Sequence, residues 1–470
     1  IRGQELRIMR QKKQILYWLL PLMGTAFALW YVKNATADVV YSDYIRLVNS
    51  YLPDVWNPAK FFVPDVLTRI PVSYLARIVN VELFGFSVTF ERVLGVLSLG
   101  LSGAVFGLYC RERRVGFLWF ALLSAVMFSL NKWEMLTNGS GWAHFLAFAC
   151  FYYHEVVLDR VWAGEEKTHD RLKLCILPWL VILGAAGPYC ASYAATLLLS
   201  YGFCMVRDHY RRADGKWDRR YVLYGLCALL PLLLYMLSNS FAVNEHAGAT
   251  GRSLGQILAD HPSFPVRFLL KSFAGILVGG EELQALVENG TLTNLGVYLL
   301  GLFVVLGYLL ALWLNLKLRL YEKTLFPMML LASGGMNHVL IFLSRYIFEK
   351  EDYAWSSRYA LQFQVGILGI VLTFALAVPI ISQSRRAWRA VTVLFCLAIL
   401  AGNGYTTYRE LKKAPYREDR FEQMARQAGD FSGMTDDKLA DLYEYHKGRD
   451  KIEQAFEILK ENHLNVFRDR

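Results

Sequence analysis

Long apolar runs alternate with short charged segments along most of this chain. A membrane-crossing helix needs about 20 largely apolar residues, and about eleven runs are candidates. Two of them are short and form one apolar stretch interrupted at Gly187-Pro188-Tyr189. Because Pro188 lacks a backbone N–H and clashes with the preceding turn, we expect a helical hairpin there; the alternative is one kinked helix, which would invert every later span. The candidate spans are residues 15–32, 93–110, 115–130, 142–158, 174–187, 194–206, 221–237, 293–315, 324–343, 361–381 and 390–404.

The charges between these runs predict an orientation. If the N-terminus is cytoplasmic, the segments on that side hold about 24 Lys and Arg residues and the short outer loops hold about four, as the positive-inside rule requires. The C-terminus then lies outside the cell membrane. The basic cytoplasmic segments are 1–14, 111–114, 159–173, 207–220, 316–323 and 383–389, and the short outer loops are 131–141, 188–193 and 344–360.

Three long segments fall on the predicted outer side, at 33–92, 238–292 and 405–470. The first contains an amphipathic stretch at 64–84 that we expect to lie on the membrane, and the second contains an apolar stretch at 264–279 that is short for a crossing. The last carries two amphipathic patterns, 436–446 and 449–462, typical of a helical pair. We therefore divide the chain into a transmembrane domain, 1–404, and an extracytoplasmic helical tail, 405–470.

Composition agrees with a polytopic all-α membrane protein. Hydrophobic residues make up 55% of the chain and charged residues 19%, with a mean hydropathy of +0.29. This composition excludes a soluble enzyme, a disordered chain and a secreted disulfide scaffold. The net charge of +10 is spread over loops, so it predicts membrane lipids as partners and no nucleic acid. The seven cysteines lie in or beside apolar runs without a Cys-x-x-Cys pair, which predicts neither a structural disulfide nor a zinc site.

The first outer segment opens with carboxylates close to the end of a span. Asp38 and Asp43 occur in the stretch Ala37-Asp-Val-Val-Tyr-Ser-Asp-Tyr-Ile-Arg46. A carboxylate at the outer membrane surface can act as a general base when it comes within about 3 Å of an acceptor hydroxyl. Asp43 could instead be a helix N-cap.

Here the sequence resembles the GT-C fold membrane glycosyltransferases, specifically the polyprenyl-phosphate-sugar-dependent branch related to protein mannosyltransferases and aminoarabinose transferases. The resemblance lies in the order of short motifs over most of residues 15–381. This sequence departs from the family pattern in one respect, because Asp43 is followed by Tyr44 where a second carboxylate is usual. The motifs are Ser42-Asp-Tyr-Ile-Arg-Leu47, Pro71-Val-Ser-Tyr-Leu75, Leu83-Phe-Gly-Phe-Ser87 with Glu91-Arg92, Lys132-Trp-Glu-Met135, Gly187-Pro-Tyr189 and Ser357-Arg-Tyr359.

The resemblance implies an integral-membrane glycosyltransferase with a GT-C-like helix bundle. It would move a sugar from a polyprenyl-phosphate donor to an extracytoplasmic glycan or cell-wall polymer, with inversion at the anomeric carbon. Asp43 is the expected base, and a second carboxylate, if needed, would come from Asp38, Glu91 or Glu134. Arg358 and Lys271, with Arg345 and Arg267, are expected on the donor phosphate, because guanidinium groups bind phosphate in a bidentate manner. Arg46 and Tyr359 are expected to support the site.

Plainer interpretations of these residues stay open. Arg358 and Arg345 could be arginines that extend to the membrane interface, and Lys271 and Arg267 could anchor lipid headgroups. Glu134 beside Trp133 could mark the interface. No cofactor is implied with certainty; Glu245, His246 and Glu281-Glu282 are open candidates for a divalent cation.

Two other functions also stay open. His338 lies inside a predicted span, where an ionisable group defaults to a functional hypothesis, and it could be the base of a membrane O-acyltransferase. A lipid-linked saccharide transporter, or flippase, is the other alternative. Such transporters usually show internal repeats, and this sequence shows none.

Overall fold

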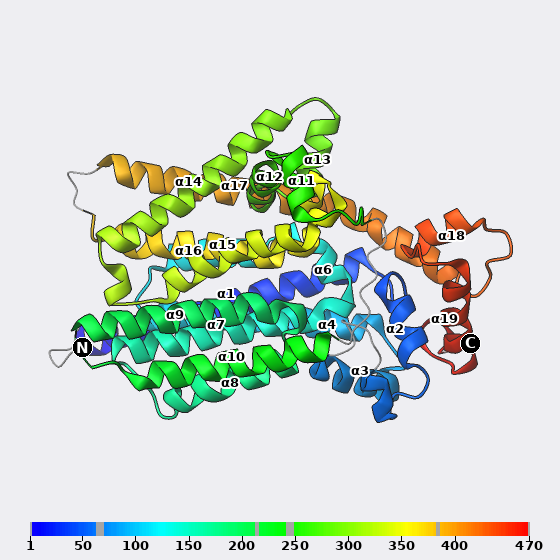
Figure 1. Cartoon of the computed structure of the whole chain (residues 1–470), viewed down its shortest axis with the longest axis horizontal. Coiled ribbons are helices and arrows are strands. Elements are labelled where there is room, and N and C mark those ends of the chain that lie inside the picture. Colours follow the sequence, from blue (N-terminus) through cyan, green and yellow to red (C-terminus); the bar gives the residue numbers. More distant parts are fainter. Residues whose placement is uncertain (1, 63–69, 212–215, 241–248, 382–385, 469–470) are drawn as a thin grey trace.

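The computed structural model describes residues 2–62, 70–211, 216–240, 249–381 and 386–468, and every regular element in these ranges is a helix. The long helices run side by side along the longest axis of the molecule, and the two ends of the chain lie at opposite ends of this bundle (Figure 1). The α-helices are α1 (Arg2–Ala35), α2 (Asp43–Tyr51), α3 (Pro71–Phe84), α4 (Val88–Glu112), α5 (Phe117–Met127), α6 (Trp133–Thr137), α7 (Trp142–Ala163), α8 (Asp170–Gly184), α9 (Cys190–Arg211), α10 (Arg219–Asn239), α11 (Leu254–Asp260), α12 (Phe264–Leu277), α13 (Gly280–Glu288), α14 (Asn294–Lys317), α15 (Phe326–Arg345), α16 (Ala360–Ala377), α17 (Arg386–Arg426), α18 (Asp436–Tyr443) and α19 (Arg449–Glu461).

Within the described ranges, 8 helical segments are long and apolar enough to cross a membrane. This confirms an all-α polytopic membrane protein, whereas the count of eleven spans stays a prediction. The three regions outside the set are α5, α7 and α8; α5 has 11 residues and α8 has 15. The qualifying segments are Ile15–Ala35, Val88–Glu112, Gly187–Arg211, Arg219–Asn239, Asn294–Lys317, Phe326–Phe348, Ser357–Ala377 and Ala387–Arg426.

The outer helices of the bundle have the apolar surface that lipid requires. On α14 the buried face carries Val297, Gly301 and Val304, and leucines repeat every three or four residues on the exposed face. In water such a stripe would drive aggregation, but in a bilayer it faces a solvent as apolar as itself. By contrast, 94% of the apolar window of the segment that contains α16 is buried inside the protein. This segment therefore forms the centre of the bundle. The exposed leucines of α14 are Leu295, Leu299, Leu302, Leu306 and Leu309.

The interruption at Gly187-Pro188-Tyr189 separates two helices, as the hairpin prediction requires. α8 ends at Gly184, a short 3-10 turn, η4, covers Gly187–Tyr189, and α9 starts at Cys190. Gly187 has a φ of 52°, a backbone conformation that glycine adopts without strain. It packs against Ile70. α8 and α9 both lie along the bundle axis beside α10 (Figure 1). The alternative of one kinked helix is wrong.

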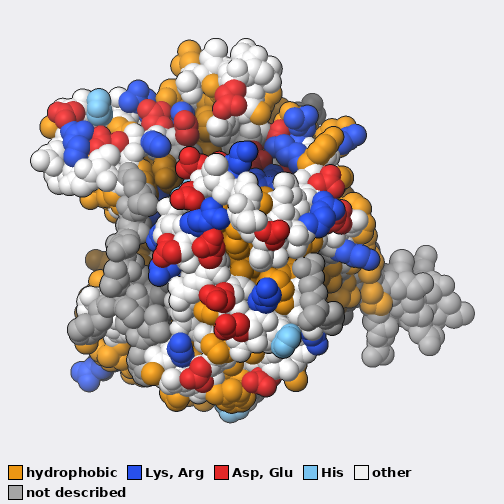
Figure 2. Space-filling view, turned by 90° about the vertical axis from the view of Figure 1, so that its right-hand side faces the viewer, with side chains coloured by type: hydrophobic (Ala, Val, Ile, Leu, Met, Phe, Trp, Pro, Cys, Tyr) orange, Lys and Arg blue, Asp and Glu red, His pale blue; other side chains and the backbone are white. Residues whose placement is uncertain are grey.

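The predicted outer segments gather at one end of the bundle. α2, α3, α11 to α13, the turns before α16 and the helices α18 and α19 lie toward the end that carries the C-terminus (Figure 1). We call this the tail end. Seen from that side, acidic and basic side chains are interspersed over the surface, with apolar patches between them (Figure 2).

The tail consists of the two helices that the sequence predicts, and it packs on the first outer segment. α18 and α19 bury Leu439 and Tyr443 against Phe456, and this core continues into α2 and Phe86. The backbone N–H of Ser42 donates to the carbonyl of Tyr443 at 2.7 Å. Residue 405, where the sequence predicts the tail to begin, lies within the 41-residue helix α17. A single helix therefore connects the last span to the tail.

Candidate functional site

Asp43 is the first residue of α2, at the tail end of the bundle. Ser42, not Asp43, occupies the N-cap position. One face of α2 is buried, including Tyr44 and Ile45, and this leaves Asp43 and Arg46 on the other face, one turn apart. Their charged groups lie 3.6 Å apart, and their side chains are 33% and 31% exposed. Asp43 is therefore reachable from solvent while lying against the protein.

Glu134 and Arg358 form an ion pair between two short helical segments. Glu134 lies in α6, and Arg358 lies in a 3-10 turn, η8 (Ser357–Tyr359), that leads into α16. One carboxylate oxygen of Glu134 receives the Arg358 Nε–H, and the other accepts the Ser357 hydroxyl at 3.0 Å. Because Arg358 is 43% exposed, part of its guanidinium stays open to solvent.

Asp43, Glu134, Arg358 and Glu444 form one electrostatic cluster. Glu134 is paired with Arg358, and the Asp43 carboxylate, whose own ion pair is with Arg46, acts on the Arg358 guanidinium electrostatically. The carboxylate of Glu444, in the tail, also lies within the field of Glu134 and Arg358, and it pairs with Arg420 at 3.1 Å. We call Asp43, Glu134, Arg358 and Glu444 the Arg358 cluster. It combines a half-exposed carboxylate with a guanidinium, which is what base catalysis beside a phosphate requires.

Tyr41 lies buried beneath this cluster. The charges acting on its phenol are those of Arg92, Glu444, Glu134 and Arg358, and burial raises the pKa of Tyr41 above its ordinary value. The phenol therefore stays neutral and packs edge-on against Phe421 of α17 at a ring-centre distance of 4.9 Å. Tyr41 links the first outer segment to the helix that carries the tail.

Arg345 and Tyr359 extend the cluster on the side of α15. The Arg345 guanidinium lies over the Tyr359 ring, 5.6 Å from its centre. Both Arg345 and Arg358 act electrostatically on Tyr189, at the tip of the turn between α8 and α9. A second cation is thus placed near Arg358, on the same side of the bundle end.

Lys271 and Arg267 form a separate group on α12. Lys271 is buried, its Nζ lies 2.7 Å from Asp352 and 3.4 Å from Glu351, and it sits 4.6 Å from the centre of the Trp355 ring. Arg267 lies 3.0 Å from Glu351. The structure thus places these cations on carboxylates of the turn η7 (Glu351–Trp355).

A cavity of about 360 Å³ lies between the two groups. Glu134 and Ser357 line it on the side of the Arg358 cluster, and Asp352 and Trp355 line it on the side of Lys271. Glu281 of α13 contributes a further acidic wall. Arg358 and Lys271 each pair with a carboxylate that lines this cavity, and of these two cations only Arg358 belongs to the cluster that contains Asp43.

The carboxylates of Asp38 and Glu91 form hydrogen bonds within the fold. Asp38 accepts the backbone N–H groups of Val88 and Thr89, at 2.7 and 3.2 Å, at the start of α4. Glu91 is buried and accepts the Tyr44 hydroxyl at 2.6 Å. Burial, and after it the Glu91 carboxylate, raises the pKa of Tyr44 well above its ordinary value, so the phenol keeps its proton and donates it in this bond. Neither carboxylate joins the Arg358 cluster.

The buried Arg92 holds the parts of the site in position. Its Nε donates to the Thr137 carbonyl at 2.6 Å and its Nη1 to the Ala37 carbonyl at 2.8 Å. It also lies 5.0 Å from the centre of the Phe421 ring. One guanidinium therefore connects α4 to the segment before α2, to the last residue of α6 and to α17.

Glu444 and Arg420 are site residues that the sequence does not reveal. They lie almost 400 positions after Asp43, in a tail with many exposed charges, and no spacing connects them to the first outer segment. Glu444 follows α18 directly and has a left-handed backbone conformation, with a φ of 53°, that ends the helix. The preceding residue, Tyr443, accepts the backbone N–H of Ser42.

The remaining candidates lie apart from the cluster. Glu281 and Glu282 pair with basic residues of α17, including Lys413, and Glu245 and His246 lie outside the described residues. Among the described residues, no group of three or more His, Cys, Asp or Glu side chains is arranged to hold a metal ion. His338 is buried within α15. A hydrogen bond of 2.7 Å joins its Nδ1 atom and Ser272 Oγ, and its ring stacks on Phe363.

No protein-family model matches the chain, and no curated protein and no solved structure matches it either.

Proposed function

We propose that the protein is an integral-membrane glycosyltransferase that transfers a sugar from a polyprenyl phosphate to an extracytoplasmic glycan or cell-wall polymer. The observation that carries this proposal is that the Asp43 carboxylate lies near enough to Arg358 to act on it electrostatically, at the tail end of a membrane bundle. A carboxylate and a guanidinium that are both partly exposed can face an acceptor and a phosphate in the same space.

The reaction follows from these two groups. Asp43 removes the proton of an acceptor hydroxyl, whose oxygen attacks the anomeric carbon of the donor sugar. The bond between that carbon and the phosphate oxygen breaks, and the phosphate keeps the electron pair. Arg358 stabilises the resulting negative charge by hydrogen bonds to the phosphate oxygens. A single displacement of this kind inverts the configuration at the anomeric carbon.

Glu134 and Arg345 have supporting roles in this proposal. Glu134 holds Arg358 through its Nε and is itself held by Ser357, so the outer nitrogens of the guanidinium are oriented before a donor binds. Arg345 adds positive charge near the same point. The lipid tail of the donor would lie along the apolar surface of the bundle, with its phosphate at the membrane surface.

The decisive experiment replaces Asp43 by asparagine in the purified full-length protein. We expect sugar transfer from a panel of polyprenyl-phosphate sugars to fall by about 10²–10⁴-fold, the usual contribution of a general base. Asp54→Asn, at an exposed position near α2, is the matched control and should transfer normally. An Asp43→Asn protein with the melting temperature and the transfer rate of the wild type would refute the assignment.

Assays of acyl transfer and of lipid movement on the same proteins separate the alternatives. An O-acyltransferase predicts acyl transfer that is lost in His338→Ala and unchanged in Asp43→Asn. A transporter predicts movement of a lipid-linked saccharide across the membrane without any new glycosidic bond.

A further inference from the structure

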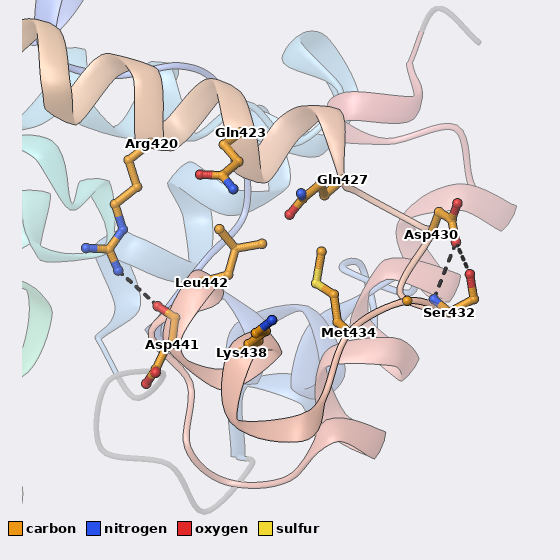
Figure 3. Close-up of a pocket in the computed structure, with 10 residues that line it drawn as sticks. Arg420, Gln423, Gln427, Asp430, Ser432, Met434, Lys438, Asp441 and Leu442 are labelled. Atoms are coloured by element: carbon orange, nitrogen blue, oxygen red, sulfur yellow. Dashed lines mark hydrogen bonds between the residues drawn. The ribbon is translucent and has the colours of Figure 1, made fainter.

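A wide groove opens in the tail, between the last turns of α17 and the helix α18. Its volume is about 830 Å³. Gln423 of α17 and Gln427, directly after this helix, extend from one side, and Met434, Lys438 and Leu442 face them from the segment that contains α18 (Figure 3). Asp430 and Ser432 close one end (Figure 3).

Two side chains of the groove, Gln427 and Lys438, each have a polar group without a partner among the described residues. The Oε1 atom of Gln427 is buried and has no hydrogen-bond partner among the described residues. A buried amide oxygen without a donor costs free energy, and a hydrogen bond from a ligand or water, once this side chain turns toward the groove, would remove that cost. In the described part of the chain, the Lys438 ammonium forms no ion pair, and it also faces the groove (Figure 3).

The chemistry of the groove favours a neutral saccharide. Its two basic residues, Arg420 and Lys438, are balanced by Asp430 and Asp441, so it has no net charge to attract a polyanion. Amide side chains both donate and accept, which suits pairs of neighbouring hydroxyl groups. The apolar surface is limited to a small patch that includes Met434. That patch matches the C–H face of a sugar ring better than the large apolar anchors with which peptides bind.

The position of the groove connects it to the Arg358 cluster. Arg420 lines the groove and donates to the backbone carbonyl of Asp441 at 2.9 Å (Figure 3). Its guanidinium also pairs with Glu444 at 3.1 Å, and Glu444 is a member of the cluster. The groove and the cluster are therefore connected through the Arg420–Glu444 pair.

We propose that this groove binds several consecutive residues of a neutral oligosaccharide, and that it holds the acceptor polymer while its end reaches Asp43. The second part of this inference rests on the proposed function. The first part, saccharide binding by the groove, can be measured without any transfer reaction.

The test is a direct binding measurement on the full-length protein in detergent, by saturation-transfer NMR and calorimetry. The probes are maltohexaose, cellohexaose and chitohexaose, with a Gly-Ser hexapeptide as the other class of ligand. We expect at least one of the oligosaccharides to bind and the peptide not to bind. The double variant Gln423→Ala/Gln427→Ala should bind that oligosaccharide about tenfold more weakly, as the loss of two hydrogen-bonding amides implies. Gln454→Ala, at an exposed position of α19, is the matched control.

A second variant blocks the groove without removing a polar group. Gly433 lines the groove, and a Cβ atom added there meets no atom within 4 Å. Gly433→Trp should therefore fold normally and abolish binding, whereas Gly255→Trp, at an equally open glycine of α11, should bind like the wild type.

The outcomes are distinct. Binding of none of the three oligosaccharides, binding of the peptide alone, or equal binding by wild type and both groove variants would overturn the groove proposal. If the protein binds an oligosaccharide through the groove but transfers no sugar, the binding site stands and the proposed function falls.

Discussion

At the scale of single residues, similar side chains near the start of the chain have different surroundings. Asp38 and Asp43 are five positions apart, but Asp38 accepts backbone N–H groups at the start of α4, whereas Asp43 is partly exposed, pairs with Arg46 and acts electrostatically on Arg358. The difference arises because one lies before α2 and the other on its exposed face. A carboxylate whose hydrogen-bonding capacity is already used by the fold is a poor base, and this favours Asp43.

Lys132 is a buried base whose titration should affect stability. Its Nζ donates to the carbonyls of Met127 and Ser129, both at 2.9 Å, and burial lowers its pKa to about 7. In the unfolded chain its pKa would be about 10.4. Between these values the unfolded state holds the proton and the folded state does not, so stability rises with pH.

We therefore expect the melting temperature in detergent to rise between pH 7 and pH 9.5. Lys132→Met should reduce this pH dependence, while its lost hydrogen bonds lower the melting temperature at every pH. Lys451→Met, on the exposed surface of the tail, is the control and should keep the dependence of the wild type. An unchanged slope in Lys132→Met would contradict the inference that this lysine titrates near neutrality.

At the scale of elements, α15 and α16 approach each other so closely that a glycine is required between them. A Cβ atom at Gly334 would lie 2.3 Å from the backbone nitrogen of Gly366, whereas one at Gly335 would meet nothing within 4 Å. Small residues of this kind let helix backbones approach closely in membranes. α16 is the helix that begins directly after Arg358, so this packing also determines where the guanidinium lies.

The two neighbouring glycines give a matched pair of substitutions. Gly334→Ala should destabilise the protein by about 1–3 kcal/mol, because the methyl group overpacks the contact, and it should lower transfer by displacing Arg358. Gly335→Ala should be neutral or stabilise the helix by up to about 1 kcal/mol. Thermal unfolding in detergent measures both, and equal effects would show that the close approach is absent.

At the scale of the whole molecule, the tail and the first outer segment form one unit. α18, α19 and α2 share a core, and Glu444 reaches the Arg358 cluster from the tail. The long helix α17 carries this unit on the membrane bundle. The tail therefore takes part in building the site and is not an appended module.

Phe456→Ala tests this coupling. Phe456 is 1% exposed and packs against Phe431 and Tyr443 at ring-centre distances of 5.4 and 4.9 Å. Its loss should cost about 3–5 kcal/mol, increase hydrogen exchange in α2 as well as in α19, and reduce sugar transfer. Glu457→Ala, at the next and exposed position, should change none of these. If α2 stays protected in Phe456→Ala, the tail is an independent unit.

The sequence by itself determined the helical class, the membrane character and the tail helices, because apolar runs and amphipathic periods are local properties that a helix displays directly. The break at Pro188 likewise follows from the chemistry of one residue. The sequence also singled out Asp43, Glu134 and Arg358, although only as separate motifs.

Only the tertiary structure decided which of the candidate residues meet. It grouped Lys271 and Arg267 with carboxylates of their own, placed Asp38 and Glu91 in hydrogen bonds within the fold, and brought Glu444 and Arg420 from the far end of the chain to the Arg358 cluster. The physical reason is that these neighbours are set by helix packing between distant segments. No local pattern of polar and apolar residues records that packing.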